Sequence, residues 1–241
     1  MQTQGATAII TGAGGGLGKY LVHELLDRGA RRVYAAGRTT ESVAGAVALD
    51  PERVQPIVLD ITNKEHARAA ANAASDATIL FNNAGIAKFG TPIDVDPAAV
   101  QEDLQVNVIG PLQVTQAFAP VLASNGGGTI VNTLSLLSLA PVTGMSPYCA
   151  AKAAAHSLTQ SLRHQLSGHR IAVLGVYPGP MDTPMLNGVE APKARPEDVA
   201  KAIVDAVEAD EEYIAPDEFS AQAYAGYSSD PKSLETMLAA F

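Results

Sequence analysis

Tyr148 and Lys152 are the two side chains whose types and spacing most directly suggest proton chemistry. They stand four residues apart in the segment 147–154, which reads as helix, and this spacing places both on one helix face. An ammonium group nearby favours the phenolate, so we expect the pKa of Tyr148 to lie below its reference value of about 10. Such a tyrosine can give or take a proton near neutral pH. The spacing by itself is common, and in isolation it is typical of a structural pair.

Other polar residues follow predicted strands. Ser135 comes at the end of one strand, thirteen residues before Tyr148. The segment 82–85 (Asn-Asn-Ala-Gly) and the segment 178–183 (Pro-Gly-Pro-Met-Asp-Thr) end two further strands. In a doubly wound sheet ligands bind at the carboxyl ends of the strands, so these residues are expected to share one site. Asn107 is the exception, because it lies inside a predicted helix.

A glycine-rich segment, Thr11-Gly12-Ala13-Gly14-Gly15-Gly16-Leu17-Gly18, joins the first predicted strand to the first predicted helix. Glycines permit a tight turn and let the backbone approach a pyrophosphate, whose charge then lies at a helix N-terminus. The segment does not fit Gly-x-Gly-x-x-Gly, but it fits Thr-Gly-x-x-x-Gly-x-Gly, and equally Thr-Gly-x-x-Gly-x-x-Gly. It predicts a dinucleotide site, with a ligand-free turn as the alternative.

The end of the second predicted strand indicates which dinucleotide would bind. An acidic residue normally holds the ribose 2′-hydroxyl of NAD at this point, whereas the chain has Gly37-Arg38 and no acid before Glu41. Arginine can form charge-assisted hydrogen bonds with the 2′-phosphate of NADP. We therefore expect NADP rather than NAD, and a solvated surface arginine is the alternative interpretation of Arg38.

In combination these motifs resemble the short-chain dehydrogenase/reductase family, in its compact single-domain branch. The resemblance extends from Thr11 to about Pro216. The glycine turn, Asp60, Asn-Asn-Ala-Gly, Asn107, the Ser…Tyr-x-x-x-Lys set and Pro-Gly occur in the family's order. The resemblance implies an oxidoreductase that interconverts a carbonyl and an alcohol by hydride transfer.

The resemblance also implies roles for individual residues. Asp60 and Ile61 would contact the adenine, the segment 83–85 the adenosine ribose, and Met181 and Thr183 the nicotinamide amide. The residues implied to bind the cofactor are Gly12, Gly14, Gly15, Gly16, Leu17, Gly18, Arg38, Asp60, Ile61, Asn83, Ala84, Gly85, Tyr148, Lys152, Pro178, Gly179, Met181 and Thr183.

Four residues carry the chemistry that the resemblance implies. Tyr148 would be the general acid/base, and Lys152 would hold the nicotinamide ribose and lower the pKa of Tyr148. Ser135 would form a hydrogen bond with the substrate oxygen, and Asn107 would hold a water that leads protons to Lys152. Ser138 is a weaker candidate for the substrate contact.

Two positions depart from the family's pattern. NADP-preferring members often carry a basic residue beside the middle glycine, where this chain has Gly15, and this tempers the NADP assignment. A second serine commonly precedes Ser135, where this chain has Leu134.

The elements that must position these residues alternate along the chain. Apolar, β-rich runs alternate with longer Ala- and Leu-rich segments, which is typical of βαβ units. We expect strands at 6–11, 32–36, 54–59, 77–81, 128–133, 170–176 and 212–215, and helices at 16–28, 41–47, 64–74, 97–123, 147–167 and 196–209. The fold class is α/β, a doubly wound (Rossmann-type) parallel sheet with helices on both faces, in a single domain over 1–241. The segment 184–195 reads as a mobile loop, and the tail from 216 has no clear assignment.

Composition restricts the partners and the compartment. Twenty-five acidic and sixteen basic residues give a net charge of −9, which argues against nucleic acid or an anionic membrane as partner. Cys149 is the one cysteine, and no metal-ligand spacing occurs among the five histidines, which are interpreted as surface or helix-face residues. The N-terminus has no basic segment typical of a signal peptide. We expect a cytoplasmic protein without a membrane span or metal.

The segment 136–147, with Met181, Met185 and Leu186 opposite, is expected to wall the substrate pocket. These side chains are apolar and include no cation, which predicts an uncharged, fairly hydrophobic small molecule, although packing alone would also explain them. The Ala-rich helices at 97–123 and 147–167 resemble those that pair subunits in the family, which implies a homodimer or homotetramer.

Three rival functions remain open. An epimerase or dehydratase of the same fold would need a substrate subdomain, for which the chain after residue 190 is short. A dehalogenase on the same sheet is disfavoured by Lys152 and the intact glycine turn. A catalytically idle NADP-binding regulator or scaffold is disfavoured by the complete set of Asn107, Ser135, Tyr148 and Lys152.

Overall fold

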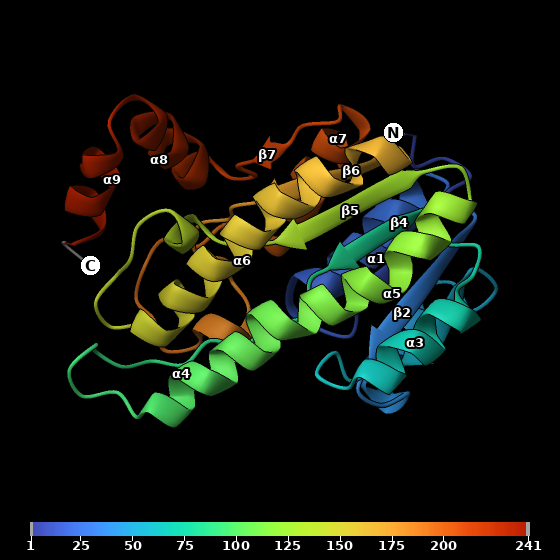
Figure 1. Cartoon of the computed structure of the whole chain (residues 1–241), viewed down its shortest axis with the longest axis horizontal. Helices are drawn as coiled ribbons and strands as arrows, with labels where there is room; N and C mark the ends of the chain where they lie inside the picture. The colour runs from blue at the N-terminus through green and yellow to red at the C-terminus, as the bar shows by residue number, and fades with distance from the viewer. Residues whose placement is uncertain (1, 240–241) are drawn as a thin grey trace.

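Seven parallel strands form the centre of the molecule, here described over residues 2–239 from a computed structural model (Figure 1). The strands are β1 (Thr7–Thr11), β2 (Arg32–Gly37), β3 (Val54–Val58), β4 (Ile79–Asn82), β5 (Gly128–Thr133), β6 (Ile171–Val176) and β7 (Tyr213–Ile214). Their order across the sheet is β3-β2-β1-β4-β5-β6-β7, so the winding direction reverses between β1 and β4. A doubly wound sheet binds its ligand at such a reversal. The expected fold class is confirmed.

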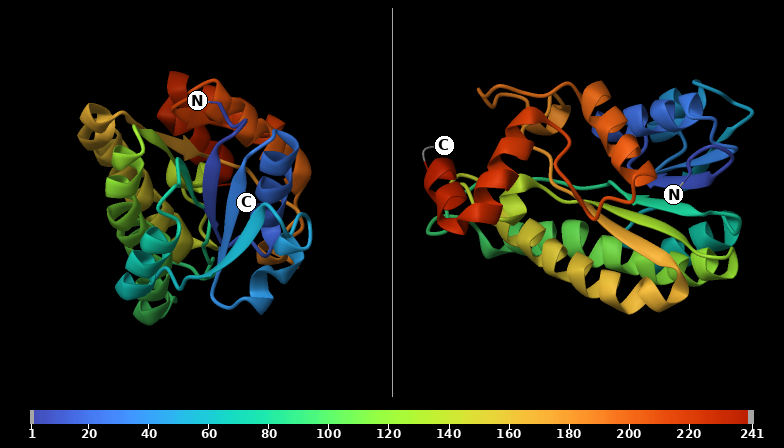
Figure 2. Two further views of the ribbon diagram at one scale, coloured as in Figure 1. Left: turned by 90° about the vertical axis from the view of Figure 1, so that its right-hand side faces the viewer. Right: turned by 90° about the horizontal axis from the view of Figure 1, so that it is seen from above.

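Helices cover both faces of this sheet (Figure 2). One face carries α1 (Gly16–Asp27), α2 (Ala44–Val47) and α7 (Pro196–Glu208), and the other carries α3 (Lys64–Ala73), α5 (Gly110–Ser124) and α6 (Ser146–Leu166). Because both faces are covered, the central strands are buried along most of their length, and all five residues of β1 are buried. The predicted strands and helices up to residue 209 all occur, with ends that differ by two residues or fewer. There are two irregularities: a short 3₁₀ turn opens the helix expected at 41–47, and the helix expected at 97–123 is interrupted.

The helix expected at 97–123 is divided into α4 (Pro97–Leu104), a π-helical turn η2 (Gln105–Ile109) and α5. The Asp96 carboxylate caps its start by accepting from the Ala98 N–H at 2.8 Å. Over Pro97–Ser124 this is the one described helix that is long and apolar enough to cross a membrane by composition, and 39% of its most apolar window is buried. It lies within the helical layer, where α5 packs on α3 and the sheet, and α4 packs on α6.

Two helices follow β7 in the tail that the sequence left unassigned: α8 (Glu218–Ser229) and α9 (Pro231–Leu238). They lie beyond the carboxyl ends of the strands, apart from the two main helical layers (Figures 1 and 2). Leu234 and Leu238 of α9 are buried against Leu136 and Ala140, which belong to the segment after β5. The tail is therefore part of the fold at the end of the sheet where the site is expected.

Candidate active site

A cavity of about 1100 Å³ opens at the carboxyl ends of the strands. It brings together all but two of the residues predicted to carry the chemistry or to bind the cofactor, although they come from segments far apart in the chain. The predicted residues that line it are Gly12, Gly14, Gly15, Gly16, Leu17, Arg38, Asp60, Ile61, Asn83, Ala84, Gly85, Ser135, Tyr148, Lys152, Pro178, Gly179, Met181 and Thr183. Gly18 and Asn107 do not line this cavity.

The turn between β1 and α1 has the backbone geometry that a pyrophosphate requires. Gly16 has a φ of +50°, which side chains disfavour, and it opens α1 directly at the cavity. A Cβ at Gly15 would meet nothing within 4 Å, so the backbone there is open to a ligand. Gly18 serves a different purpose, because a Cβ at this position would overlap the Gly12 carbonyl oxygen. The turn thus presents a helix N-terminus to the cavity, and it fits a pyrophosphate.

Thr11 ties this turn to the segment after β4. Its hydroxyl donates to the Phe81 carbonyl at 3.2 Å and accepts from the N–H groups of Asn83 and Ala84 at 2.9 and 3.0 Å. The Asn83 amide returns a hydrogen bond to the Thr11 carbonyl at 3.0 Å. The sequence indicated Thr11 only as the first residue of the glycine-rich motif. Its buried hydroxyl fixes the glycine turn and the segment after β4 relative to each other.

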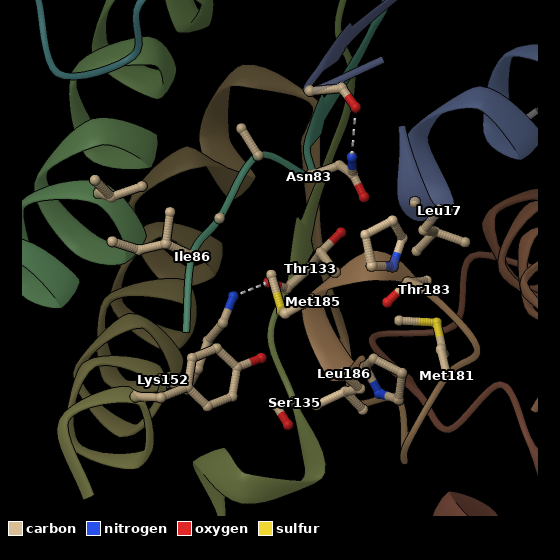
Figure 3. Close-up of a pocket in the computed structure, with 18 of the residues that line it drawn as sticks. Leu17, Asn83, Ile86, Thr133, Ser135, Lys152, Met181, Thr183, Met185 and Leu186 are labelled. Carbon is tan, nitrogen blue, oxygen red and sulfur yellow. Dashed lines mark hydrogen bonds between the residues drawn. The ribbon is translucent and has the colours of Figure 1, made fainter. Parts of the chain in front are cut away.

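Ser135, on the segment after β5, and Lys152, on α6, meet at the other end of the cavity (Figure 3). Tyr148 of α6 lines the cavity with them. The Lys152 Nζ lies 5.6 Å from the centre of the Tyr148 ring and donates to the Thr133 carbonyl at 2.7 Å. All three side chains are less than 10% exposed, Ser135 at 7%, Tyr148 at 9% and Lys152 at 6%. The spacing of four therefore does place Tyr148 and Lys152 together, facing the end of β5.

Comparison with known proteins agrees with this geometry. Residues 6–194 match the family model described as short chain dehydrogenase. "Short-chain dehydrogenase/reductase 3" of Bos taurus is 30% identical over 218 residues, which cover 83% of this chain and 71% of the relative. A short-chain dehydrogenase from Burkholderia cenocepacia J2315, solved in complex with NADP, superimposes with a TM-score of 0.92 at 38% identity, over 99% of both chains. The chain belongs to the short-chain dehydrogenase family.

Burial dominates the electrostatics of this short-chain dehydrogenase site. It raises the pKa of Tyr148 to about 12, against a smaller lowering by a hydrogen bond with Ser135. It also lowers the pKa of Lys152 to about 8. The expectation that Lys152 pulls the pKa of Tyr148 below 10 is wrong for the protein alone. The ammonium donates to the Thr133 carbonyl. The loss of water around the phenol destabilises the phenolate more than the hydrogen bond with Ser135 stabilises it.

Asn107 lies behind the cavity rather than on its surface. Its Nδ2 donates to the Ile86 carbonyl at 3.0 Å, and its Oδ1 accepts from the Ile86 N–H at 3.3 Å. A second, much smaller cavity of about 20 Å³ is lined by Asn107, Lys152 and Thr133 among others. Asn107 therefore reaches the site through Lys152 and the backbone of the segment after β4.

Ser138 does not fit the role of a substrate contact. It is buried, does not line the cavity, and its hydroxyl accepts from the Ser135 N–H at 3.1 Å. The Ser135 hydroxyl in turn accepts from the Leu137 N–H at 3.1 Å, so the two serines cap the short turn η3 (Leu136–Ser138). Ser138 thereby positions the backbone of Ser135.

Two of the five histidines, which the sequence predicted to be surface or helix-face residues, make specific contacts from their helices. The His66 Nδ1 accepts from the Asp60 N–H at 3.3 Å, beneath the cavity wall. The His156 Nδ1 lies 2.8 Å from the hydroxyl of the fully buried Tyr177. A histidine on a helix carries no sequence signal for such contacts, because its partner lies outside that helix, in a segment that follows a strand.

Proposed function

We propose that the chain is an NADP(H)-dependent oxidoreductase that interconverts a ketone or aldehyde and the corresponding alcohol. The convergence of Ser135, Tyr148 and Lys152 at one end of a cavity, whose other end is a glycine turn, carries this proposal. A nicotinamide dinucleotide bound along the cavity would supply the hydride. The chain itself supplies hydrogen bonds, a proton and the exclusion of water.

Tyr148 acts as the general acid in the proposed reduction. At neutral pH its phenol holds its proton, because burial keeps its pKa near 12. The Ser135 hydroxyl and the Tyr148 hydroxyl both donate hydrogen bonds to the carbonyl oxygen of the substrate, where negative charge develops. Tyr148 then gives its proton to that oxygen as the alcohol forms, and the positive charge of Lys152 stabilises the phenolate that remains. In the oxidation direction Tyr148 takes the proton back.

The proposed cofactor residues follow the walls of the cavity. The glycine turn would hold the pyrophosphate, Asp60 and Ile61 the adenine, and the segment 83–85 the adenosine ribose. Pro178, Gly179, Met181 and Thr183 would line the nicotinamide, and Lys152 would bind its ribose. Asp60 is held in place for this role, because its carboxylate accepts from the N–H and the hydroxyl of Thr62 at 2.9 and 2.7 Å, which lowers its pKa.

The structure gives a physical reason to propose NADP in preference to NAD. A Cβ at Gly37 would lie 2.5 Å from the Ser42 Oγ and 2.6 Å from the Val43 Cγ1, so an acidic side chain has no room where an NAD-binding acid would stand. Arg38 follows directly and, like Ser42, lines the cavity. An arginine beside a hydroxyl suits a 2′-phosphate. The similar Burkholderia protein is itself a complex with NADP.

An uncharged, fairly hydrophobic substrate fits the remaining walls. These come from the segment after β4, the segment after β5, the loop 184–195 and the tail. The apolar lining residues are Ile86, Phe89, Leu136, Leu137, Val142, Met145, Met185, Leu186, Val189, Phe219 and Leu238. Of the side chains that line the cavity in the described residues, Arg38 and Lys152 are the cationic ones, and both have other proposed roles. A carboxylate or phosphate on the substrate would find no partner there.

We also propose a cytoplasmic location and an assembly of two or four copies, with neither nucleic acid nor membrane as partner. The assembly is supported by the helix Pro97–Ser124, whose most apolar window is only 39% buried in the single chain. A partner copy packed on this helix would remove the apolar surface from water.

The Tyr148→Phe variant tests the proposed chemistry. A panel of ketones, aldehydes and alcohols is first assayed by NADPH absorbance, and then with NADH, to find an active substrate and the preferred cofactor. We expect Tyr148→Phe to reduce carbonyl reduction at least about 100-fold, because the proton donor is lost, while NADPH binding followed by fluorescence changes little.

The matched control is Tyr20→Phe, which makes the same chemical change on α1, outside the cavity. It should leave the rate within twofold of the wild type, because Tyr20 keeps its ring packed on the core and loses only a hydroxyl outside the cavity. Near-normal reduction by Tyr148→Phe would refute the mechanism, and an NADH preference would refute the argument from Gly37 and Arg38. Tight NADPH binding without turnover on any substrate would favour a cofactor-binding regulator.

A further inference from the structure

Asp103 of α4 is a buried charge that the proposed chemistry does not use. Among the residues that the structure describes, Asp103 and Lys152 are the only charged side chains classed as buried, with 0 and 6% of their surface exposed. Burying an ion is costly unless hydrogen bonds and other charges compensate. Since Lys152 is the proposed partner of Tyr148, the second buried charge belongs to the surroundings of the same site.

Both oxygens of the Asp103 carboxylate are occupied by N–H donors. Its Oδ1 accepts from the Asn107 Nδ2 at 2.9 Å, and its Oδ2 accepts from the Lys88 backbone N–H at 3.1 Å. Asp103 and Asn107 are four residues apart, across the start of the π-helical turn η2, so they lie on the same face of the helix. An ionised carboxylate only accepts hydrogen bonds, and every partner here donates, so the geometry fits the charged form.

These contacts connect Asp103 to the segment that separates it from the cavity. Asn107 holds the Ile86 backbone through both its amide atoms, and Asp103 holds the Lys88 backbone, so the segment 85–88 is fixed at two points. Gly85 shows how close this arrangement lies to Lys152. A Cβ there would be 2.7 Å from the Asn107 Oδ1 and 3.8 Å from the Lys152 Nζ.

We propose that Asp103 is a positioning residue for the reaction: its carboxylate orients the Asn107 amide and the backbone of 85–88, and through them fixes the surroundings of Lys152. Ile86 and Gly85 line the cavity, so the same contacts also shape the wall beside the reacting atoms. The proposal rests on the proposed function, because its kinetic effect presupposes catalysis by Tyr148 and Lys152.

The charges around Asp103 are consistent with this assignment. Lys88 and Glu102 lie beside it and pair with each other at 2.9 Å, at the partly exposed edge of α4. Tyr148, Cys149 and Lys152 face it from α6. Burial raises the pKa of Asp103, while its hydrogen bonds with Lys88 and Asn107 lower it. Its negative charge also raises the pKa of Lys152, against the effect of burial.

Four variants test the proposal: Asp103→Leu, Asp103→Asn, Asn107→Ala and the double variant Asp103→Leu/Asn107→Ala. We expect Asp103→Leu to lower kcat about 10- to 100-fold, with KM for NADPH within threefold, because the hydrogen bonds of Asp103 go to Asn107 and Lys88 and none goes to the glycine turn that would hold the pyrophosphate. Asp103→Asn keeps one acceptor but presents an N–H₂ group to the second donor, so its kcat should be intermediate. If the two residues act as one unit, the double variant should lose no more than the worse single variant.

A second measurement does not depend on turnover. Amide hydrogen exchange should be at least about tenfold faster across 85–89 in Asp103→Asn and Asp103→Leu, because the contacts that hold this backbone are weakened, and unchanged in β1. Asp27→Asn is the matched control, since it makes the same change on a carboxylate that is 63% exposed on α1. It should alter neither rate nor exchange.

The outcomes separate the two proposals. If the wild type reduces carbonyls and Tyr148→Phe does not, the proposed function stands. In that case a wild-type kcat and wild-type exchange in Asp103→Asn, or losses that multiply in the double variant, overturn the role of Asp103. If Asp103→Leu does not fold, Asp103→Asn and Asn107→Ala give the same decision from kcat and exchange.

Discussion

At the scale of one residue, Lys152 illustrates how a proposed catalytic side chain opposes stability. Its ammonium is 6% exposed, and burial lowers its pKa to about 8 from a reference of 10.5. Burial therefore destabilises the charged form of Lys152 in the folded chain, and the hydrogen bond to the Thr133 carbonyl offsets part of this free energy. A side chain kept under these conditions is better explained by the reaction than by packing.

Replacing Lys152 by Met should remove a pH-dependent contribution to the free energy of unfolding. Between pH 8 and 10.5 the unfolded wild type binds a proton that the folded protein has released, so its free energy of unfolding rises with pH. The Met variant lacks this contribution. We expect its stability relative to the wild type to fall by about 2 kcal/mol between pH 7 and 9.5, as measured by urea unfolding without cofactor.

Lys64→Met is the control for this experiment, because Lys64 is exposed at the start of α3. Its stability difference from the wild type should stay constant over the same range. Tyr148 adds nothing to the comparison, since it is present in every variant and ionises above this range. A constant difference for Lys152→Met as well would show that the buried lysine is not perturbed.

The convergence of Ser135, Tyr148 and Lys152 on one cavity could be predicted from the sequence, whereas the environments of these residues could not. The spacing of Tyr148 and Lys152 gives their common face, but the depth at which that face is buried depends on β5 and on the segment after it. Asp103 was missed for a related reason. An acidic residue in an amphipathic helix is usually interpreted as solvent-exposed, and only the packing of α4 on α6 buries it.

At the scale of elements, the tail lines the proposed substrate end of the cavity through Phe219 and Leu238. The Asp217 carboxylate accepts from the Gly179 N–H at 2.9 Å and from the Ser220 N–H at 2.8 Å, so it caps α8 and ties it to the Pro-Gly segment after β6. From this anchor, α9 brings Leu238 to the cavity wall. The proposed cofactor segment and the proposed substrate wall are thus joined by one side chain.

Leu238 should therefore affect which substrates are reduced. Leu238→Trp places a larger side chain at this wall, and we expect kcat/KM for a bulky hydrophobic ketone to fall about tenfold more than for a small one. Leu238→Ala should shift the preference in the opposite direction. Both ratios are measured with NADPH at saturation.

The adjacent residue provides the control. Met237 is 36% exposed and does not line the cavity, so Met237→Ala should leave the ratio of the two ketones unchanged. Equal losses for both ketones in Leu238→Trp would mean that the tail only supports the fold and does not select substrates.

Local signals explain which elements could be predicted. The strands and helices up to residue 209 pack into the layers of the sheet and its two helical faces, so their hydrophobic patterns are visible in the sequence. The tail packs on the segments after β5 and β6, and its short helices have a narrow apolar face, formed in α9 by Leu234 and Leu238. The π-helical turn η2 could not be predicted, because a single turn of wider helix leaves the hydrophobic pattern almost unchanged.

At the scale of the whole molecule, one helical layer retains uncovered apolar surface. The helix Pro97–Ser124 has a most apolar window only 39% buried, and Ile109 at its middle is 41% exposed. The net charge of −9 keeps chains apart at long range, so association has to come from such an apolar face. A second copy with the same face would cover it symmetrically.

Sedimentation equilibrium should accordingly give two or four times the chain mass of 24.9 kDa. Ile109→Asp puts a charge into the proposed interface, and we expect it to shift the equilibrium toward the monomer at least about tenfold, since burying an unpaired carboxylate is costly. Leu49→Asp is the matched control, because Leu49 is 45% exposed just beyond α2, away from this helix. It should leave the assembly intact. A wild type that sediments as a monomer at micromolar concentration would exclude this interface, whereas dissociation by Leu49→Asp but not by Ile109→Asp would move the interface to the other face of the sheet.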